Sequence, residues 1–430
     1  MMRFNSVAFN VFAFYVLIST TAQAAEWKLE PSASIRGQYN DNVGMRNENN
    51  NPVSSTGYTL IPKIKFSIEE QNLWDVSLNT RGKFTRYQNL DDADSNNVFA
   101  KFDSGRKTER AAYRLNASYT RNTNFDDDFD TQSPIAGLVD NKTERKTVTF
   151  SPSIRWNSSQ TSVAILSVNI TDISYEEVTS LNLRGYTNDN ISFRAYRQLL
   201  EKHSLGFTAS YTEQDTPSIE FTANTAALNL DYTYKVNQRS SLELSLGARR
   251  VKSFTPDEPA CDIQGGSIVP LDGADECPNF PPLIISVPTV IEGLDSVNDG
   301  TVINLSYSIQ DENNSHNFNI ARNVVPSSTG SVQEQRAANY RFGIKSTEKI
   351  SSDILFDGSE TTVIGGGDSS NDRTRYRVDS TVRYKLTRDW SLNFKYSYIY
   401  QNITNTDEDS RSNAIYINLS LNWPKLATTY

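Results

Sequence analysis

The feature that most limits the fold of this chain is a period of two in the placement of its apolar residues. Between residues 390 and 400 every second residue is Trp, Leu, Phe or Tyr, and mostly polar residues lie between them. The segments 228–235, 242–246 and 415–423 repeat the pattern. Such alternation is typical of a β-strand whose two faces meet different surroundings. No amphipathic helix pattern follows residue 24, and no later apolar run reaches the ~18 residues that a membrane helix needs.

About eighteen segments show this alternation, and most of them are about 10 to 15 residues long. They lie near residues 29–41, 57–69, 72–87, 97–105, 108–121, 143–157, 160–172, 187–199, 202–213, 221–236, 239–254, 299–311, 314–323, 332–347, 350–357, 372–387, 389–401 and 412–423. Short polar turns follow the even-numbered segments, and longer loops follow the odd-numbered ones. The longest loop, 255–298, contains seven of the 15 prolines and both cysteines.

This asymmetry is the pattern of an outer-membrane barrel, with tight periplasmic turns and long external loops. The sequence therefore predicts an all-β fold: a single transmembrane antiparallel β-barrel of about 18 strands (16–18) in a Gram-negative outer membrane. A soluble β-sandwich or β-helix is the alternative. Against it, one face of each strand is apolar and rich in Tyr, while the other carries Arg, Lys, Asn and Ser. A closed barrel also leaves no unpaired sheet edge in lipid.

The first 24 residues have the features of a secretory signal peptide. Arg3 supplies the positive start, residues 7–18 are mostly apolar, and Ala22-Gln23-Ala24 forms a cleavage site. A retained anchor helix is the alternative, but the segment is short for one. We expect a signal peptide at 1–24 and one barrel domain at 25–430. Cys261 and Cys277 enclose a short loop, so in an oxidising periplasm we expect them to form a disulfide.

The five tryptophans provide a check that does not depend on the strand count. All of them fall at the periplasmic ends of the expected strands: Trp27, Trp74, Trp156, Trp390 and Trp423. Indole rings favour the membrane–water interface, where the ring is buried and the N–H stays hydrated. We therefore expect these residues to form a periplasmic aromatic girdle.

The inward face of the expected barrel carries more bases than acids. Its principal basic residues are Arg81, Lys83, Arg114, Arg155, Arg249, Arg375, Arg377, Arg383 and Lys385. The acidic excess lies in the loops, at 126–130 and across 255–298. One hypothesis is a net positive lumen that favours anionic solutes, because rings of Arg and Lys select anions. The alternative is that lumen charges pair with one another and that loop acids bind divalent cations at the lipopolysaccharide layer.

No catalytic or cofactor motif is found, and we predict no enzyme, no cofactor and no metal site. The chain has only 2 His residues, and both His203 and His316 lie in or beside periplasmic turns. A net charge of -9 argues against a nucleic-acid partner. Two loops are candidates for gating the pore: 122–141, which could fold inward, and 255–298, which could act as a lid.

The residues Leu29-Glu30-Pro31-Ser32-Ala33-Ser34-Ile35 and Tyr39-Asn40-Asp41-Asn42-Val43 resemble the opening strand of a known family. These are the outer-membrane β-barrel porins found in exopolysaccharide and capsule biosynthesis loci of Gram-negative bacteria. The resemblance implies a role in passing secreted polysaccharide across the outer membrane, and it brings no catalytic residues. Members usually end in Phe, whereas this chain ends in Tyr430. Because Pro424 cannot continue a central ladder, we expect 425–430 to be a short periplasmic tail.

The function expected from these observations is a pore for exopolysaccharide export. A general diffusion porin for small anionic solutes and a non-conducting surface adhesin barrel remain alternatives. The expected partners are outer-membrane lipids and lipopolysaccharide, the barrel assembly machinery, polysaccharide as the passenger, and a periplasmic export protein docked on the short turns.

Overall fold

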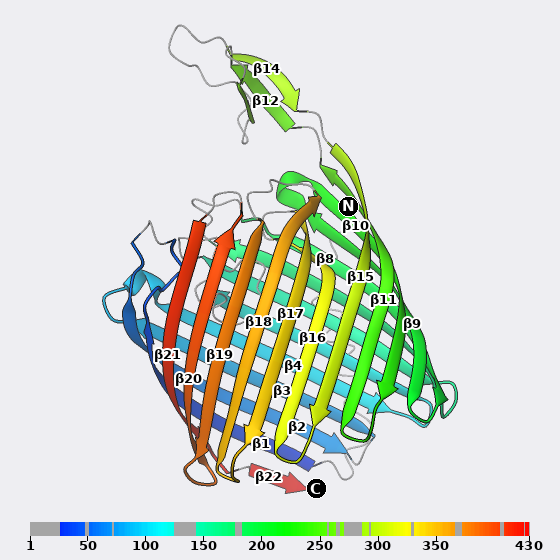
Figure 1. Cartoon of the computed structure of the whole chain (residues 1–430), viewed down its shortest axis with the longest axis vertical. Coiled ribbons are helices and arrows are strands. Elements are labelled where there is room, and N and C mark those ends of the chain that lie inside the picture. The colour runs from blue at the N-terminus through cyan, green and yellow to red at the C-terminus, as the bar shows by residue number, and fades with distance from the viewer. Residues whose placement is uncertain are drawn as a thin grey trace.

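The computed structural model describes residues 26–47, 51–70, 73–123, 143–176, 183–255, 258–263, 267–270, 286–291, 294–327, 331–365, 372–404, 408–424 and 426–429. Within them a nineteen-stranded antiparallel sheet closes on itself (Figure 1). Eighteen of its strands form a barrel, and the nineteenth, β22 (Leu426–Thr429), is a short addition to β1. Among the described residues, no helix is long and apolar enough to cross a membrane.

Each barrel strand pairs with its neighbours in chain order, and β1 pairs with β21 to close the barrel. The barrel strands are β1 (Glu26–Asn40), β2 (Ser55–Glu70), β3 (Trp74–Tyr87), β4 (Ser95–Lys107), β5 (Ala111–Thr123), β6 (Glu144–Asn157), β7 (Ser162–Glu176), β8 (Tyr186–Leu200), β9 (His203–Thr216), β10 (Phe221–Lys235), β11 (Ser240–Thr255), β15 (Leu294–Gln310), β16 (Asn314–Pro326), β17 (Val332–Lys345), β18 (Ile350–Gly365), β19 (Arg373–Lys385), β20 (Trp390–Ile403) and β21 (Glu408–Asn422).

The expected all-β barrel, with short turns at one end and longer loops at the other, is confirmed. All eighteen expected segments are strands. The segment expected at 350–357 is longer than predicted, because β18 continues to Gly365. The long loop 255–298 is not without structure: it contains a three-stranded sheet of β12 (Glu258–Ile263), β13 (Ser267–Pro270) and β14 (Ser286–Ile291).

Two predictions fall wholly or partly outside the described residues. The signal peptide expected at 1–24 lies outside them. Cys261 belongs to β12, where it stands opposite Val269 and Pro288, but Cys277 lies outside the described residues. The disulfide between the two cysteines therefore stays a prediction.

The chain after Pro424 corrects one expectation. Residues 425–430 were expected to form a tail, yet Leu426–Thr429 is a strand that pairs with Glu26–Leu29 of β1. Between the two paired segments the ladder is interrupted around Pro424, which has no N–H to donate. Just before it, the Trp423 N–H donates to the Pro31 carbonyl at 3.1 Å. Strand β1 is thus paired on both edges along nearly its whole length.

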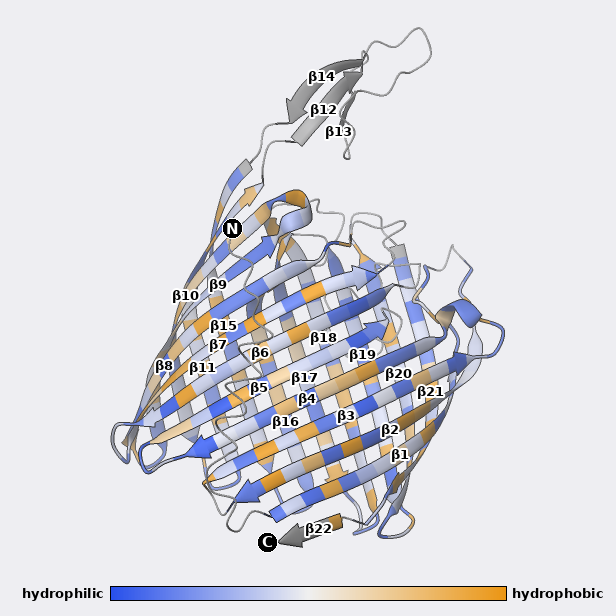
Figure 2. Ribbon diagram, turned by 180° about the vertical axis from the view of Figure 1, so that it is seen from behind, coloured by the Kyte–Doolittle hydropathy of each residue, from blue (hydrophilic) through white to orange (hydrophobic). Residues whose placement is uncertain are grey.

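The outward faces of neighbouring strands match across the barrel closure. In β1, Ile35 and Tyr39 are exposed, and their partners Leu419 and Ile415 on β21 are exposed too. Ribbons coloured by hydropathy show the same alternation along many strands (Figure 2). Because side chains have a period of two, one register places the alternating apolar residues of a strand on the same face.

We expect the outward face to tolerate charge poorly. Ile170 of β7 is 44% exposed on that face, and replacing it by Arg should destabilise the barrel by ~2–4 kcal/mol if the site is near the bilayer midplane. Thr171→Arg, on the inward face of the same strand, is the matched control and should change stability little. Urea unfolding in lipid vesicles measures both. Equal losses in the two variants would contradict the assignment of the faces.

Candidate functional site

The outer surface shows where the barrel meets lipid. Near the loop end, tyrosine hydroxyls on the outer face donate to polar groups: Tyr211 to Asn224 and Tyr396 to Asn413, each at 2.7 Å. At the other end stand tryptophans. On β3 the outward Trp74 and Phe84 are ten residues apart, which at ~3.4 Å per residue and a tilt of ~40° gives ~26 Å, close to the ~25 Å apolar band of outer-membrane barrels. The protein is an integral outer-membrane β-barrel of a Gram-negative bacterium.

All five tryptophans lie beside the short turns, on the outward-facing positions of their strands. Trp156, Trp390 and Trp423 are exposed there at 58%, 40% and 46%. Trp27 and Trp74 are partly buried at the starts of β1 and β3. Their role as a periplasmic girdle stays a prediction that this placement supports.

The two histidines lie at the same end, on the outer face. His203 begins β9, and its Nδ1 lies 2.8 Å from the hydroxyl of Tyr232. His316, near the start of β16, has the same arrangement with Tyr340 at 2.9 Å. Neither histidine faces the lumen. In the described part of the chain, no group of three His, Cys, Asp or Glu residues could hold a metal ion.

The lumen wall carries its densest positive charge on β19. Arg373, Arg375, Arg377, Arg383 and Lys385 all lie on the inward, odd-numbered positions of this strand, opposite in phase to the outward Tyr376, and Asp379 and Thr381 separate the first three from the last two. The three upper arginines are buried, whereas Arg383 and Lys385, near the periplasmic end, are exposed. Alternate residues of a strand are ~7 Å apart. The five side chains therefore form a column along the lumen.

One acid connects this column to the next strand. The Asp379 carboxylate accepts a hydrogen bond from Arg377 and another from the Ser397 hydroxyl at 2.6 Å. The Lys395 ammonium lies 3.3 Å from the same carboxylate and 5.7 Å from the centre of the Tyr416 ring. Asp379 neutralises one of its two basic partners, and Asp357 of β18 stands opposite Arg377, so the positive surplus of this part of the wall comes from Arg373 and Arg375.

The other expected lumen residues are spread around the barrel. Arg81 lies over the ring of Phe99, 4.1 Å from its centre. Lys83 shares the inward face of β3, while Arg114 and Arg155 are exposed on the inward faces of β5 and β6. The structure thus does not bring these four bases together with the column on β19.

A cavity of about 240 Å³ opens on the lumen side of β15–β19. Amide side chains and arginines form most of its lining: Asn304, Asn319, Ala321, Asn323, Gln335, Ala337, Asn339, Asp357, Ser359, Thr361, Arg373, Arg375 and Arg377. Within the described residues, the Nε and Nη1 atoms of Arg377 are buried and have no hydrogen-bond partner. One arginine of this lining therefore keeps buried hydrogen-bond donors that the described chain leaves unused.

Near the loop end, the upper parts of β16–β18 leave the barrel wall and lie inside it, against β10 and β11. Pairing between β15 and β16 stops at Ile303 and Arg322, although both strands continue beyond that point. Above it, Val324 and Ile364 occupy the same alternate positions as the outward Ile320 and Phe356. They pack against a buried cluster in which Phe221 and Ala223 of β10 and Val251 of β11 meet Val332 of β17.

The outward face of the upper β16–β18 segment thus lies against the inward face of β10 and β11. Figure 1 shows the upper end of β18 bending toward β10. On β9, the Gln214 amide donates to the Ser331 carbonyl at 3.4 Å. We call residues 323–327, 331–336 and 360–364 the flap. It lies inside the wall and narrows the extracellular mouth.

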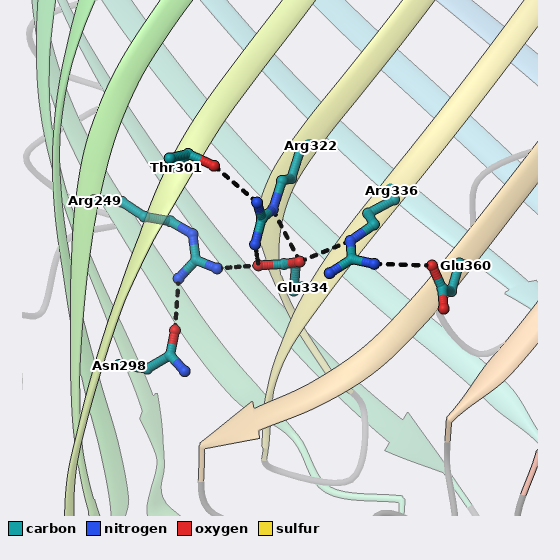
Figure 3. Close-up of polar contacts among 7 residues, drawn as sticks. All are labelled: Arg249, Asn298, Thr301, Arg322, Glu334, Arg336 and Glu360. Carbon is teal, nitrogen blue, oxygen red and sulfur yellow. Dashed lines mark hydrogen bonds and ion pairs between the residues drawn. The ribbon is translucent and has the colours of Figure 1, made fainter.

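Charged groups hold the seam beside the flap (Figure 3). Glu334 accepts hydrogen bonds from Arg249 of β11, from Arg322 at 2.9 Å and from Arg336 at 3.0 Å. The side chains of Arg249 and Glu334 are only 1% and 6% exposed. Removing one partner from a buried pair like this costs about 3–5 kcal/mol. Arg249 was expected among the inward-facing bases, and in the structure it ties β11 to the flap.

The flap is an element that the sequence reasoning missed. The two loops expected to gate the pore were others. Of 122–141, residues 124–141 lie outside the described residues, and 255–298 contains the small sheet β12–β14. A signal for the flap was present, because Phe221 and Val251 are apolar residues on inward positions. Val324 and Val332 are apolar residues next to an external loop, where polar ones are usual.

No protein-family model and no curated protein matches the chain. Among solved structures, it is similar to the ferric-catecholate import receptor Fiu from E. coli K12, at 10% identity over 93% of this chain and 82% of that one, with a TM-score of 0.47. It is also similar to the ferric citrate transporter FecA in its unliganded form, at 9% identity over 87% of this chain and 60% of that one, with a TM-score of 0.48. For the outer membrane protein OpdK from Pseudomonas aeruginosa the identity is 9% over 92% of this chain and 99% of that one, and the TM-score is 0.43. With identities this low, the function has to be argued from the chain's own residues.

The charge on the column predicts a change in ion selectivity. Replacing Asp379 by Asn removes the negative charge that Arg377 and Lys395 share, so anions should be favoured more strongly than in the parent protein. Reversal potentials in a salt gradient measure this. Asp299→Asn is the control, because Asp299 pairs with Arg250 on the outer face. A shift toward cations, or equal shifts in both variants, would sink the idea of a positive lumen.

Proposed function

We propose that this barrel is the conduit through which an exopolysaccharide leaves the cell across the outer membrane. The observation that carries the proposal is the chemistry of the inward wall, which presents guanidinium, ammonium and amide groups. Such groups hydrogen-bond hydroxyls and carboxylates without needing a tight pocket. In the periplasmic half, Arg114, Arg155, Arg383 and Lys385 are exposed. A hydrated chain that enters from the periplasm therefore meets donors along its path.

The size of the barrel supports the same function. Barrels of 16 to 18 strands enclose an aqueous channel, whereas about eight strands leave an interior that side chains fill. The resemblance of residues 29–35 and 39–43 to porins of exopolysaccharide loci points in the same direction. In this proposal a periplasmic export protein docks on the short turns. Lipids and lipopolysaccharide surround the barrel, which the barrel assembly machinery inserts.

A deletion strain tests the proposal. Polysaccharide should fall in the medium and accumulate in the periplasm, and the parent gene should restore export. Complementation with the double variant Arg383→Glu and Lys385→Glu should restore export several-fold less well, because it reverses the charge at the periplasmic entrance. Arg388→Glu changes an exposed turn residue next to that entrance, outside the lumen, and should restore export fully.

Other outcomes separate the alternatives. Unchanged secretion in the deletion strain, together with conductance of the reconstituted protein, would point to a general porin for small anionic solutes. Unchanged secretion without conductance would point to an adhesin barrel. Either result would overturn the proposed export function.

A further inference from the structure

We propose that the cavity on β15–β19 is a binding site for a saccharide that carries carboxylate groups. This inference rests on the proposed function and names the class of its passenger. The key group is Arg377, which is 4% exposed and donates to Asp379 through Nη2 only. Its buried Nε and Nη1 have no partner among the described residues. A buried guanidinium N–H without a partner is costly, and a carboxylate oxygen is a charged acceptor that suits such a donor.

The neighbours of Arg377 fit a sugar rather than a bare ion. Arg373 and Arg375 add positive charge above it on the same strand. Asn319, Asn339 and Gln335 face the cavity from β16 and β17. Amides both donate and accept, as sugar hydroxyls do, so they can satisfy a ring whose carboxylate lies on the arginines. A simple anion would bind the arginines alone and would form no hydrogen bonds with the amides.

Block of ion current by defined oligosaccharides tests the site in the reconstituted full-length protein. Oligogalacturonate should block the current, and its methyl ester, which has the same length but no charge, should not. Arg377→Gln should weaken the block on the order of tenfold, the effect of losing one charge-assisted hydrogen bond. Arg250→Gln removes a guanidinium from the outer face and should leave the block unchanged.

Equal block by the acid and its ester, or no effect of Arg377→Gln, would overturn the site. The outcome is separable from the export test. Block without any secretion defect in the deletion strain keeps the site and removes the export function. A secretion defect without block keeps export and removes the site.

A different observation carries a second inference: we infer that the flap is a gate that can leave the lumen. The seam between β15 and β16 is unpaired above Ile303 and Arg322, so residues 294–302 of β15 have a backbone edge ready to receive β16. The contacts that hold the flap inside include Val332 in its apolar cluster, Glu334 with its arginines, and the hydrogen bond from Gln214 to Ser331. The flap thus has two packings available, one inside the lumen and one in which β16 pairs with the open edge of β15. A segment with two packings that differ by a few side-chain contacts is a two-state element.

Single-channel recording tests the gate. Val332→Asp places a charge in the apolar cluster and should raise the ratio of open to closed states by on the order of tenfold. Val297→Asp is the control, because Val297 is 61% exposed on the outer face of β15. Its open fraction should equal that of the parent.

A crosslink gives the opposite prediction. Gln214→Cys and Ser331→Cys, combined with Cys261→Ser and Cys277→Ser and joined by a short thiol crosslinker, should hold the flap closed and abolish the openings until the link is cleaved. Band shifts between heated and unheated samples in gel electrophoresis verify that each variant folds. Unchanged gating in both the Val332→Asp and the crosslinked proteins would overturn the gate.

Discussion

The whole structure depends on one constraint: in lipid, each backbone N–H and C=O needs a partner within the sheet. Strand β1 shows how fully this is met. One edge pairs with β2 from Glu26 to Asn40. The other edge needs two segments, β21 for residues 32–40 and β22 for 26–29, joined by the Trp423–Pro31 hydrogen bond. Pro424 breaks the ladder only where β21 ends, at the periplasmic rim, where water can satisfy the groups that are left.

Closing the barrel in lipid restricts which residues its outer face can carry, but it places no such restriction on the inner face. Lipid disfavours charged residues on the outer face, so most of the chain's charged side chains lie inward or near the rims. Acids inside are few, and several contact more than one base. Asp379 serves Arg377 and Lys395, while Glu334 serves three arginines. Each acid can thus hold strands together while the surrounding wall keeps its positive charge.

The strands were predictable from sequence because period-two alternation is a local property, and every expected segment is a strand. The flap was not predictable in this way. Val324 and Ile364 follow the outward pattern correctly, but their partner is the inner face of β10 and β11 rather than lipid. Alternation tells which residues share a face and not what that face meets. For the same reason, Arg249 was correctly placed inward, but its partner Glu334, 85 residues away, could not be foreseen.

The saccharide site and the gate share residues, and this ties binding to opening. Asn323 and Gln335 line the cavity, and both belong to the flap. Moving the flap therefore removes part of the cavity's amide lining. A ligand that needs those amides binds the closed state better, and it must shift the equilibrium toward that state. Because a conduit needs sites that its passenger can leave, tight binding here would oppose export. The arginine column extends below the flap to Arg383 and Lys385, so it offers the passenger positions that opening does not disturb.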